Sequence, residues 1–248
     1  MKTILLLHGM GGPNPLNKIE DGLKESGQYQ IIKPVMPGFR SEDGIIEYTD
    51  EKYVEFIEKL RQKLGIETWI VLGYSMGGRT AMNYTFKYPQ RVEKLILVDS
   101  VGIDYMIPPV KYKWGKPVLK KLLTPALRWG CIQEILGKGD FRDSKSKAYE
   151  IGKQWVSNMM KKVVVRKNFV EILTTIAKPI ENIEEKLSNL KMKVLLLWAE
   201  EDQTAKIESC YYIQKLIQNV QVFVLPDYRH MAPIEKPEFY IRHIKAFI

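Results

Sequence analysis

The sequence predicts an α/β protein with a mostly parallel sheet of about six strands. Six short apolar segments recur along the chain, several of them apolar without alternation, and longer amphipathic segments separate them. Parallel strands that helices cover on both faces are apolar throughout, whereas half-exposed strands alternate. Repeated strand–helix–strand units give a parallel sheet with right-handed crossovers. The 248 residues are enough for one such domain with an insertion.

The apolar segments predict strands at Thr3–Leu7, Gln30–Val35, Trp69–Gly73, Lys94–Val98, Lys193–Trp198 and Val220–Leu225. The amphipathic segments predict helices at Leu16–Glu25, Thr49–Leu64, Met76–Tyr88, Ile207–Gln218 and Glu238–Phe247. The second strand contains Pro34, whose nitrogen cannot donate a hydrogen bond, so this strand suits the edge of a sheet. We therefore expect six parallel strands with the second strand at an exposed margin.

The alternation of strands and helices stops between the fourth and fifth predicted strands. From residue 103 to residue 192 the pattern is helical and basic, with 18 Lys and Arg against 9 Asp and Glu, whereas the rest of the chain carries 20 of each. The whole excess of the net charge of +9 lies in this segment, which suggests a distinct unit. We predict a core of residues 1–102 and 191–248 with a helical cap of residues 103–190.

The strongest functional signal is Gly73-Tyr74-Ser75-Met76-Gly77-Gly78. It follows an apolar strand and precedes a helix, as a nucleophile elbow requires. The glycines leave room for a tight turn beside the serine. Ser75 then lies at a helix N-terminus, where free backbone N–H groups favour developing negative charge. We predict that Ser75 is a nucleophile; a glycine-rich helix cap that binds phosphate or nothing is the alternative.

A second glycine-rich segment, His8-Gly9-Met10-Gly11-Gly12, ends the first predicted strand. Acyl transfer generates an oxyanion, and backbone N–H groups are its usual donors. The N–H groups of Met10 and Met76 are the candidates for this oxyanion hole. His8 is interpreted as an anchor of the loop.

His230 is the candidate base, because it follows the last predicted strand and lies in a loop at the carboxyl end of the sheet. Ligands bind at that end in open α/β folds. The chain has three histidines. Of the other two, His8 suits a structural role and His243 lies inside the C-terminal helix, where it suits the surface or packing.

The candidate acid is Asp202, which follows the fifth predicted strand and gives the chain order serine, aspartate, histidine. Glu200 and Glu201 are close enough to compete. Asp99, at the end of the fourth strand, is a topologically allowed alternative. Asp227 lies too near the loop of the histidine to be favoured.

Across nearly its whole length the chain resembles the serine-nucleophile branch of the α/β-hydrolase superfamily. The matching pieces are His8-Gly9-Met10-Gly11-Gly12, Pro37-Gly38-Phe39, Gly73-Tyr74-Ser75-Met76-Gly77-Gly78, Tyr88-Pro89-Gln90-Arg91-Val92, Asp202 and His230-Met231-Ala232-Pro233-Ile234-Glu235-Lys236-Pro237. The resemblance implies a catalytic triad of Ser75, Asp202 and His230 under a helical cap. The chain departs from the family pattern in lacking the usual first antiparallel strand pair and in carrying Val35 and Ala199 where Asp and Gly are usual.

The expected function is hydrolysis of a carboxylic ester of small or medium acyl chain through an acyl-enzyme. Epoxide hydrolases and haloalkane dehalogenases resemble this fold but use an aspartate as nucleophile. The alternatives are a lyase or carbon–carbon bond hydrolase acting on an anionic substrate, or a non-catalytic ligand-binding module. The elbow also resembles that of the menaquinone-pathway lyase, where the arginine at the Arg79 position helps bind an anion. Arg79 is therefore a candidate substrate-binding residue, although it also suits a charge on the helix surface. Gly9, Tyr74 and Trp155 are further candidate substrate-binding residues.

No cofactor or metal is expected, since the two cysteines have no ligand spacing. The apolar N-terminal stretch is too short for a signal peptide and lacks a cleavage site, which favours a cytoplasmic protein. The expected partner is a small-molecule ester, with no nucleic acid, and the protein is expected to be a monomer or homodimer. For the basic segment we favour a solvated face; steering of an anionic substrate and contact with an anionic membrane surface are the alternatives.

Overall fold

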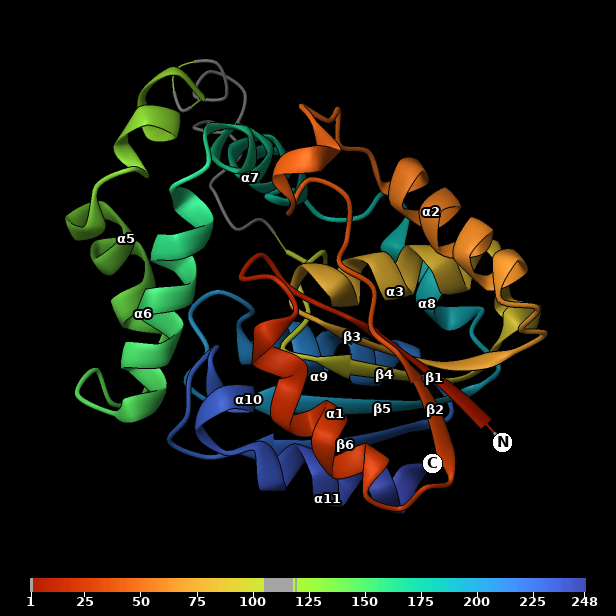
Figure 1. Ribbon diagram of the computed structural model, residues 1–248. Coiled ribbons are helices and arrows are strands. Elements are labelled where there is room, and N and C mark those ends of the chain that lie inside the picture. The colour runs from red at the N-terminus through yellow and green to blue at the C-terminus, as the bar shows by residue number, and fades with distance from the viewer. Residues whose placement is uncertain (1, 105–117, 119) are drawn as a thin grey trace.

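The computed structural model describes residues 2–104, 118 and 120–248, and its centre is a six-stranded parallel sheet (Figure 1). The strands lie in the order β2-β1-β3-β4-β5-β6, and every pair is parallel. They are β1 (Lys2–Leu7), β2 (Tyr29–Ile32), β3 (Trp69–Tyr74), β4 (Val92–Val98), β5 (Lys193–Ala199) and β6 (Val220–Leu225). The predicted α/β class with six parallel strands is thus confirmed.

Strand β2 is the edge that the sequence predicts. It pairs along Tyr29–Ile32 with β1 on one side, and no described strand pairs with its other side. The strand ends two residues before Pro34, earlier than the predicted boundary at Val35. Proline lacks the backbone N–H that a ladder needs, so pairing stops before it.

Helices cover both faces of the sheet (Figure 1). On one face, α1 (Asn17–Lys24) and α11 (Pro237–Phe247) pack against inward side chains such as Ile4 and Leu6. On the other, α2 (Asp50–Lys63), α3 (Met76–Lys87) and α9 (Ile207–Leu216) pack against side chains such as Leu5 and Leu7. Successive strand residues point to opposite faces. The apolar runs are therefore buried on both faces of the sheet, as their lack of alternation predicts.

The segment between β4 and β5, which we call the β4–β5 segment (residues 103–190), holds α5 (Gly130–Gly137), α6 (Lys147–Met160), α7 (Val163–Ile176) and α8 (Ile183–Ser188). Helices α5 and α6 lie to one side of the sheet and α7 lies near the edge where the strands end (Figure 1). Leu127, Met160 and Val170 form an apolar cluster separate from the two that flank the sheet. No strand occurs in the described part of this segment.

Short elements complete the fold. They are η1 (Asn14–Leu16), η2 (Ser41–Asp43), η3 (Pro89–Arg91), η4 (Lys138–Asp140) and α10 (Ala232–Glu235). Within the described ranges, no helix has the length and apolar character that crossing a bilayer requires.

Candidate active site

Ser75 occupies a sharp turn between β3 and α3. Its φ is 55° and its ψ is −119°, a combination that residues other than glycine seldom adopt. The turn is held by the surrounding backbone: Ser75 N–H donates to Val98 O at 3.0 Å, and Val101 N–H donates to Ser75 O at 3.2 Å. The strained turn therefore holds the serine hydroxyl at the carboxyl end of the sheet.

Two glycines of the elbow are required by close backbone approach. A Cβ on Gly73 would lie 2.3 Å from Gly77 O, and a Cβ on Gly77 would lie 2.1 Å from Leu7 O. Neither position tolerates a side chain, because the neighbouring atoms are backbone. The glycines of the motif thus allow the first turn of α3 to pack directly on β1 and β3.

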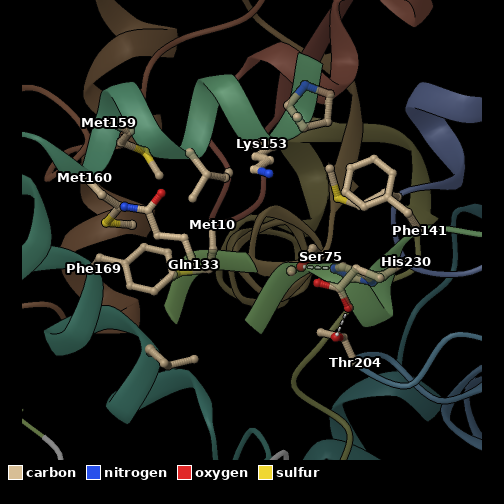
Figure 2. A pocket seen from close by; sticks show the side chains of 18 of the residues that line it. Met10, Ser75, Gln133, Phe141, Lys153, Met159, Met160, Phe169, Thr204 and His230 are labelled. Carbon is tan, nitrogen blue, oxygen red and sulfur yellow. Dashed lines mark hydrogen bonds between the residues drawn. The ribbon is translucent and has the colours of Figure 1, made fainter. Parts of the chain in front are cut away.

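The structure brings the three predicted groups together in a hydrogen-bonded chain. The Ser75 hydroxyl donates to His230 Nε2 at 2.9 Å (Figure 2). His230 Nδ1–H donates to Asp202 Oδ2 at 2.6 Å. The second oxygen of Asp202 accepts the backbone N–H groups of Thr204 at 2.7 Å and Ala205 at 2.8 Å. Both carboxylate oxygens are thus occupied, which fixes the orientation of the imidazole.

The charge state of His230 depends on the carboxyl groups around it. Burial would lower the pKa of His230, but the charge of Asp202, the hydrogen bond to it and the charges of Asp140 and Asp99 raise that pKa to about 9. A histidine accepts a proton only in its neutral form. Any activity that uses His230 as a base is therefore expected to rise with pH through this pKa.

The glycine-rich loop after β1 is anchored by His8. His8 Nδ1–H donates to Gly9 O at 2.7 Å, and His8 Nε2 accepts Met36 N–H at 2.9 Å. Burial lowers the pKa of His8 to about 4, so the ring is neutral, as these two bonds require. His8 thus has the anchoring position predicted for it.

The anchored loop lies directly beside the elbow. A Cβ on Gly9 would come within 2.9 Å of Ser75 Cβ, so only glycine allows this approach. Within the described part of the chain, no protein atom accepts the backbone N–H of Met10 or Met76. These two groups are therefore free to bind an oxyanion that forms at Ser75.

Ser75 and His230 open into a cavity of about 280 Å³. Apolar side chains from the β4–β5 segment form most of its wall, with Met159, Met160 and Phe169 on one side and Phe141 near His230 (Figure 2). The charged residues of its lining are Glu134, Asp140 and Lys153. Lys153 lies 3.4 Å from Glu134, so the lysine among the described residues of the lining already has a carboxylate partner.

A family-wide sequence profile, described as the alpha/beta hydrolase fold, matches residues 2–125 and 141–237. The chain belongs to this family. Among curated relatives, it is 24% identical over 256 residues to a 2-hydroxy-6-oxo-6-phenylhexa-2,4-dienoate hydrolase of Burkholderia cepacia, covering 100% of this chain and 87% of the relative. It is 28% identical over 257 residues to Lipase 1 of Psychrobacter immobilis, covering 99% of this chain and 76% of the relative.

Solved structures of other α/β hydrolases share the fold. A thermophilic esterase from Thermogutta terrifontis superposes with a TM-score of 0.82 at 22% identity, over 100% of this chain and 89% of the esterase. A bromoperoxidase from Bacillus anthracis superposes with the same TM-score at 17% identity, over 99% of this chain and 91% of that chain. The fold of this α/β hydrolase therefore agrees with proteins of different activities, and the substrate must be argued from the site.

Tyr74, a predicted substrate-binding residue, lines the cavity and also contacts His230. Its hydroxyl donates to His230 O at 2.8 Å, and its ring stacks on the imidazole with centroids 5.3 Å apart. The hydroxyl is thus committed to the backbone of the His230 loop. This contact positions the loop and leaves the Tyr74 ring as the part that faces the cavity.

Arg79, a predicted substrate-binding residue, is not among the described residues that line the Ser75 cavity, and it is buried instead of lying on the helix surface. Its side chain is 1% exposed, and Nε and Nη2 donate to the two oxygens of Asp50 at 2.8 and 2.7 Å. Nη1 donates to Lys178 O at 2.7 Å. The sequence could not reveal this partner, because Asp50 lies 29 residues away at the start of α2.

Trp155 also lies outside the Ser75 cavity, contrary to prediction. It lines a second cavity with Phe39 and Arg40. On α6 the residues that line the Ser75 cavity recur at helical spacing, at positions 149, 152, 153, 156, 159 and 160, which places them on one face. Position 155 lies off that face.

The alternative acids have other contacts. Asp99 Oδ1 accepts Ala199 N–H at 2.7 Å and Oδ2 accepts the Tyr240 hydroxyl at 3.1 Å, and burial raises the pKa of Asp99 well above its usual range. Glu201 lies 3.5 Å from Arg229 at the surface. Of the acids considered from the sequence, Asp202 is the one that hydrogen-bonds to His230.

Sequence reasoning did not single out Asp140 or Thr204, which also line the cavity. The Thr204 hydroxyl donates to Asp140 Oδ1 at 2.9 Å. Asp140 lies in the basic segment without a motif around it, so the sequence carries no signal for it. Thr204 lies two residues after Asp202, and that proximity was the one available clue.

Replacing Asp50 with asparagine is expected to lower the free energy of unfolding by about 2–3 kcal/mol, because it leaves the buried Arg79 guanidinium without its counter-charge. Urea denaturation followed by circular dichroism measures this. Glu47→Gln is the matched control: it breaks the exposed ion pair of Glu47 with Lys52 and should change stability little. Unchanged stability of Asp50→Asn, with weakened binding of an anionic substrate, would instead support a role of Arg79 in binding substrate.

Proposed function

We propose that this protein is a serine hydrolase that cleaves carboxylic esters of small or medium acyl chain through an acyl-enzyme. Ser75 Oγ attacks the ester carbonyl while its proton passes to His230 Nε2, and the N–H groups of Met10 and Met76 bind the resulting oxyanion. His230 then gives the proton to the departing alcohol. Water attacks the acyl-enzyme by the same route and releases the acid.

The observation that carries the proposal is the hydrogen-bonded chain from Ser75 through His230 to Asp202 at the floor of the cavity. A nucleophile, its base and an orienting acid within hydrogen-bond distance are the arrangement that acyl transfer requires. A ligand-binding module would need none of these contacts. The arrangement therefore favours an enzyme over a non-catalytic binding protein.

The lining of the cavity supports an uncharged acyl chain. Its described wall is mostly apolar, and the described residues of the lining include two carboxyl residues, Glu134 and Asp140, and one lysine. A substrate carboxylate in this cavity would lose its hydration beside like charges. A cavity of about 280 Å³ is at the small end of the range for ligand sites, which favours a short or medium chain.

A carbon–carbon bond hydrolase is the second candidate, because several relatives carry that activity in their names. The Burkholderia cepacia relative acts on a 2-hydroxy-6-oxo-dienoate by name, and such a substrate carries a carboxylate. Lys153 is the group of the described lining that could bind it. Its pKa is raised by the charge of Glu134, so it is charged at neutral pH, but it is already paired.

We further propose that the β4–β5 segment acts as a cap that supplies the acyl-binding wall, since Met159, Met160 and Phe169 belong to it. For its surplus of lysines the solvated face remains our preferred interpretation. Lys153 is the single lysine of the segment in the described lining of the Ser75 cavity.

Ester preference tests the proposed substrate. Each methylene that the cavity buries contributes up to about 0.8 kcal/mol, or roughly fourfold in kcat/KM. We expect kcat/KM for p-nitrophenyl esters to rise from acetate to butyrate and hexanoate and to fall for palmitate, which exceeds the cavity. The p-nitrophenyl monoester of glutaric acid should react at least about tenfold more slowly than the pentanoate, because its carboxylate must be desolvated.

The same assay separates the two candidates. A faster reaction of the glutaric monoester than of the pentanoate, together with cleavage of 2-hydroxy-6-oxo-6-phenylhexa-2,4-dienoate, would favour the carbon–carbon hydrolase. Ester cleavage with the expected chain-length optimum and without dienoate cleavage would support the ester hydrolase.

A further inference from the structure

Asp140 lies where the β4–β5 segment meets the two loops that carry the base and the acid. It ends the short η4 helix and lines the Ser75 cavity. Its carboxylate accepts the Thr204 hydroxyl at 2.9 Å, and its backbone carbonyl accepts Met231 N–H at 2.8 Å. One residue thus contacts the loop after β5 and the loop after β6.

Thr204 connects Asp140 to the acid. Its backbone N–H donates to Asp202 Oδ1 at 2.7 Å, while its hydroxyl donates to Asp140. Thr204 lies beside His230 at the edge of the cavity (Figure 2). A single threonine therefore holds two carboxylates on the side of the cavity where the imidazole lies.

The residues after Asp140 contact the loop after β6 and the short helix α10 that follows it. The Glu235 carboxylate accepts the backbone N–H groups of Arg142 at 3.0 Å and Asp143 at 3.3 Å. The Arg142 guanidinium lies over the Tyr228 ring, 4.7 Å from its centroid. Contacts of the Asp140 side chain and contacts of the residues that follow it therefore both restrict the position of Asp140.

The charged groups near His230 come from several elements. The carboxyl groups are those of Asp202, Asp140 and Asp99, of which Asp99 directly follows β4 and is buried, and the Tyr74 ring stacks on the imidazole. Burial raises the pKa of Asp99 well above its usual range, and the charge of Asp202 acts in the same direction. Among the described residues of the lining, Lys153 on α6 and Glu134 on α5 form an ion pair.

Burial also raises the pKa of Asp140, but the charge of His230 and the hydrogen bond from Thr204 oppose this shift. These two interactions act in favour of the ionised form of Asp140, whereas burial and the charge of Asp202 keep its pKa raised. A carboxylate near an imidazolium stabilises it. During acyl transfer His230 passes through its protonated form, which is the form that a carboxylate at Asp140 stabilises.

We propose that Asp140 is a positioning residue of the active site, whose carboxylate stabilises protonated His230 from the β4–β5 segment and whose bond with Thr204 steadies the Asp202 loop. The inference rests on the function proposed above, in which His230 is the base for Ser75. It adds a second carboxylate to that site and makes the electrostatics of the base depend on the cap.

The test is the pH dependence of kcat/KM for p-nitrophenyl butyrate at constant ionic strength. His230 acts when neutral, so activity falls on the acid side as His230 becomes protonated. Asp140→Asn removes a charge that favours protonation. We expect the acid limb of its pH profile, where kcat/KM falls with decreasing pH, to move to lower pH by about one unit. We also expect the plateau of kcat/KM to fall severalfold, because the imidazolium of the transition state loses stabilisation.

Two comparisons separate this role from a general structural one. Asp143→Asn removes an exposed charge from the same stretch of chain, where Asp143 Oδ1 accepts Lys145 N–H, and should keep the wild-type limb. Asp140→Glu restores the charge and should return the limb toward the wild-type pH. Should Asp140→Asn fail to fold, Thr204→Val, which loses the hydroxyl, should shift the limb in the same direction, while Thr204→Ser should not.

An acid limb of Asp140→Asn at the wild-type pH would overturn the inference, as would equal shifts in Asp140→Asn and Asp143→Asn. These outcomes differ from failure of the proposed function. If the Ser75→Ala protein hydrolyses the ester as fast as the wild type, the proposed function itself is wrong. If hydrolysis depends on Ser75 but the limb does not depend on Asp140, only this inference is lost.

Discussion

Replacement of Ser75 by alanine is expected to reduce kcat/KM for p-nitrophenyl butyrate by about 10⁴-fold or more. The hydroxyl is the attacking group in the proposed mechanism, and no other atom of the elbow can form the acyl-enzyme. The strained backbone of the turn does not depend on the hydroxyl, since Ser75 N–H and O make its hydrogen bonds. The variant should therefore fold with a near-native melting temperature, which separates loss of chemistry from loss of structure.

Ser100→Ala is the matched control for this variant. Ser100 is a buried serine beside the elbow, but its hydroxyl lies 3.4 Å from Gly73 O and 3.3 Å from Val98 O rather than near His230. Its loss should leave most of the activity. Equal losses in Ser75→Ala and Ser100→Ala would indicate that damage to the elbow, and not removal of a nucleophile, explains the effect.

Asp202→Asn is expected to reduce kcat by about 10³–10⁴-fold, because an amide at this position favours the wrong tautomer of His230 and no longer stabilises its protonated form. This expectation is based on the hydrogen bond of 2.6 Å from His230 Nδ1–H to Asp202 Oδ2. Steady-state kinetics at a pH on the plateau measures it.

Glu200→Gln and Glu201→Gln change neighbouring carboxylates of the same loop and should retain most of the activity. Asp99→Asn is the informative comparison, because Asp99 is the other acid that the topology allows. Its oxygens bond Ala199 N–H and the Tyr240 hydroxyl, so its loss should reduce stability more than kcat. A mild Asp202→Asn with an inactive, folded Asp99→Asn would identify Asp99 as the acid.

The sheet could be predicted from the sequence because burial on both faces leaves a local record. Each strand is a short apolar run, and Pro34 marks the edge strand. The five helices predicted from the sequence begin and end within two residues of their predicted bounds, since amphipathic spacing is also local. The individual helices of the β4–β5 segment were not predicted, because their apolar residues pack partly on each other and partly around a cavity.

The site was predictable where chemistry imposes a local pattern. Gly73 and Gly77 are required by backbone contacts of under 3 Å, and these glycines make the elbow visible in the sequence. Arg79 was misjudged because its ion pair with Asp50 joins two helices that are distant in sequence. Asp140 was missed for the same reason: only the folded chain brings it to Thr204 and Met231.

The most direct test of the account is mass spectrometry of the protein after reaction with a serine-reactive organophosphonate. If Ser75 is the nucleophile activated by His230, the wild type should gain one phosphonyl group per chain, and peptide mapping should place it on Ser75. The Ser75→Ala protein should gain none. A label on another residue, or full ester hydrolysis by a protein that takes no label, would contradict the account.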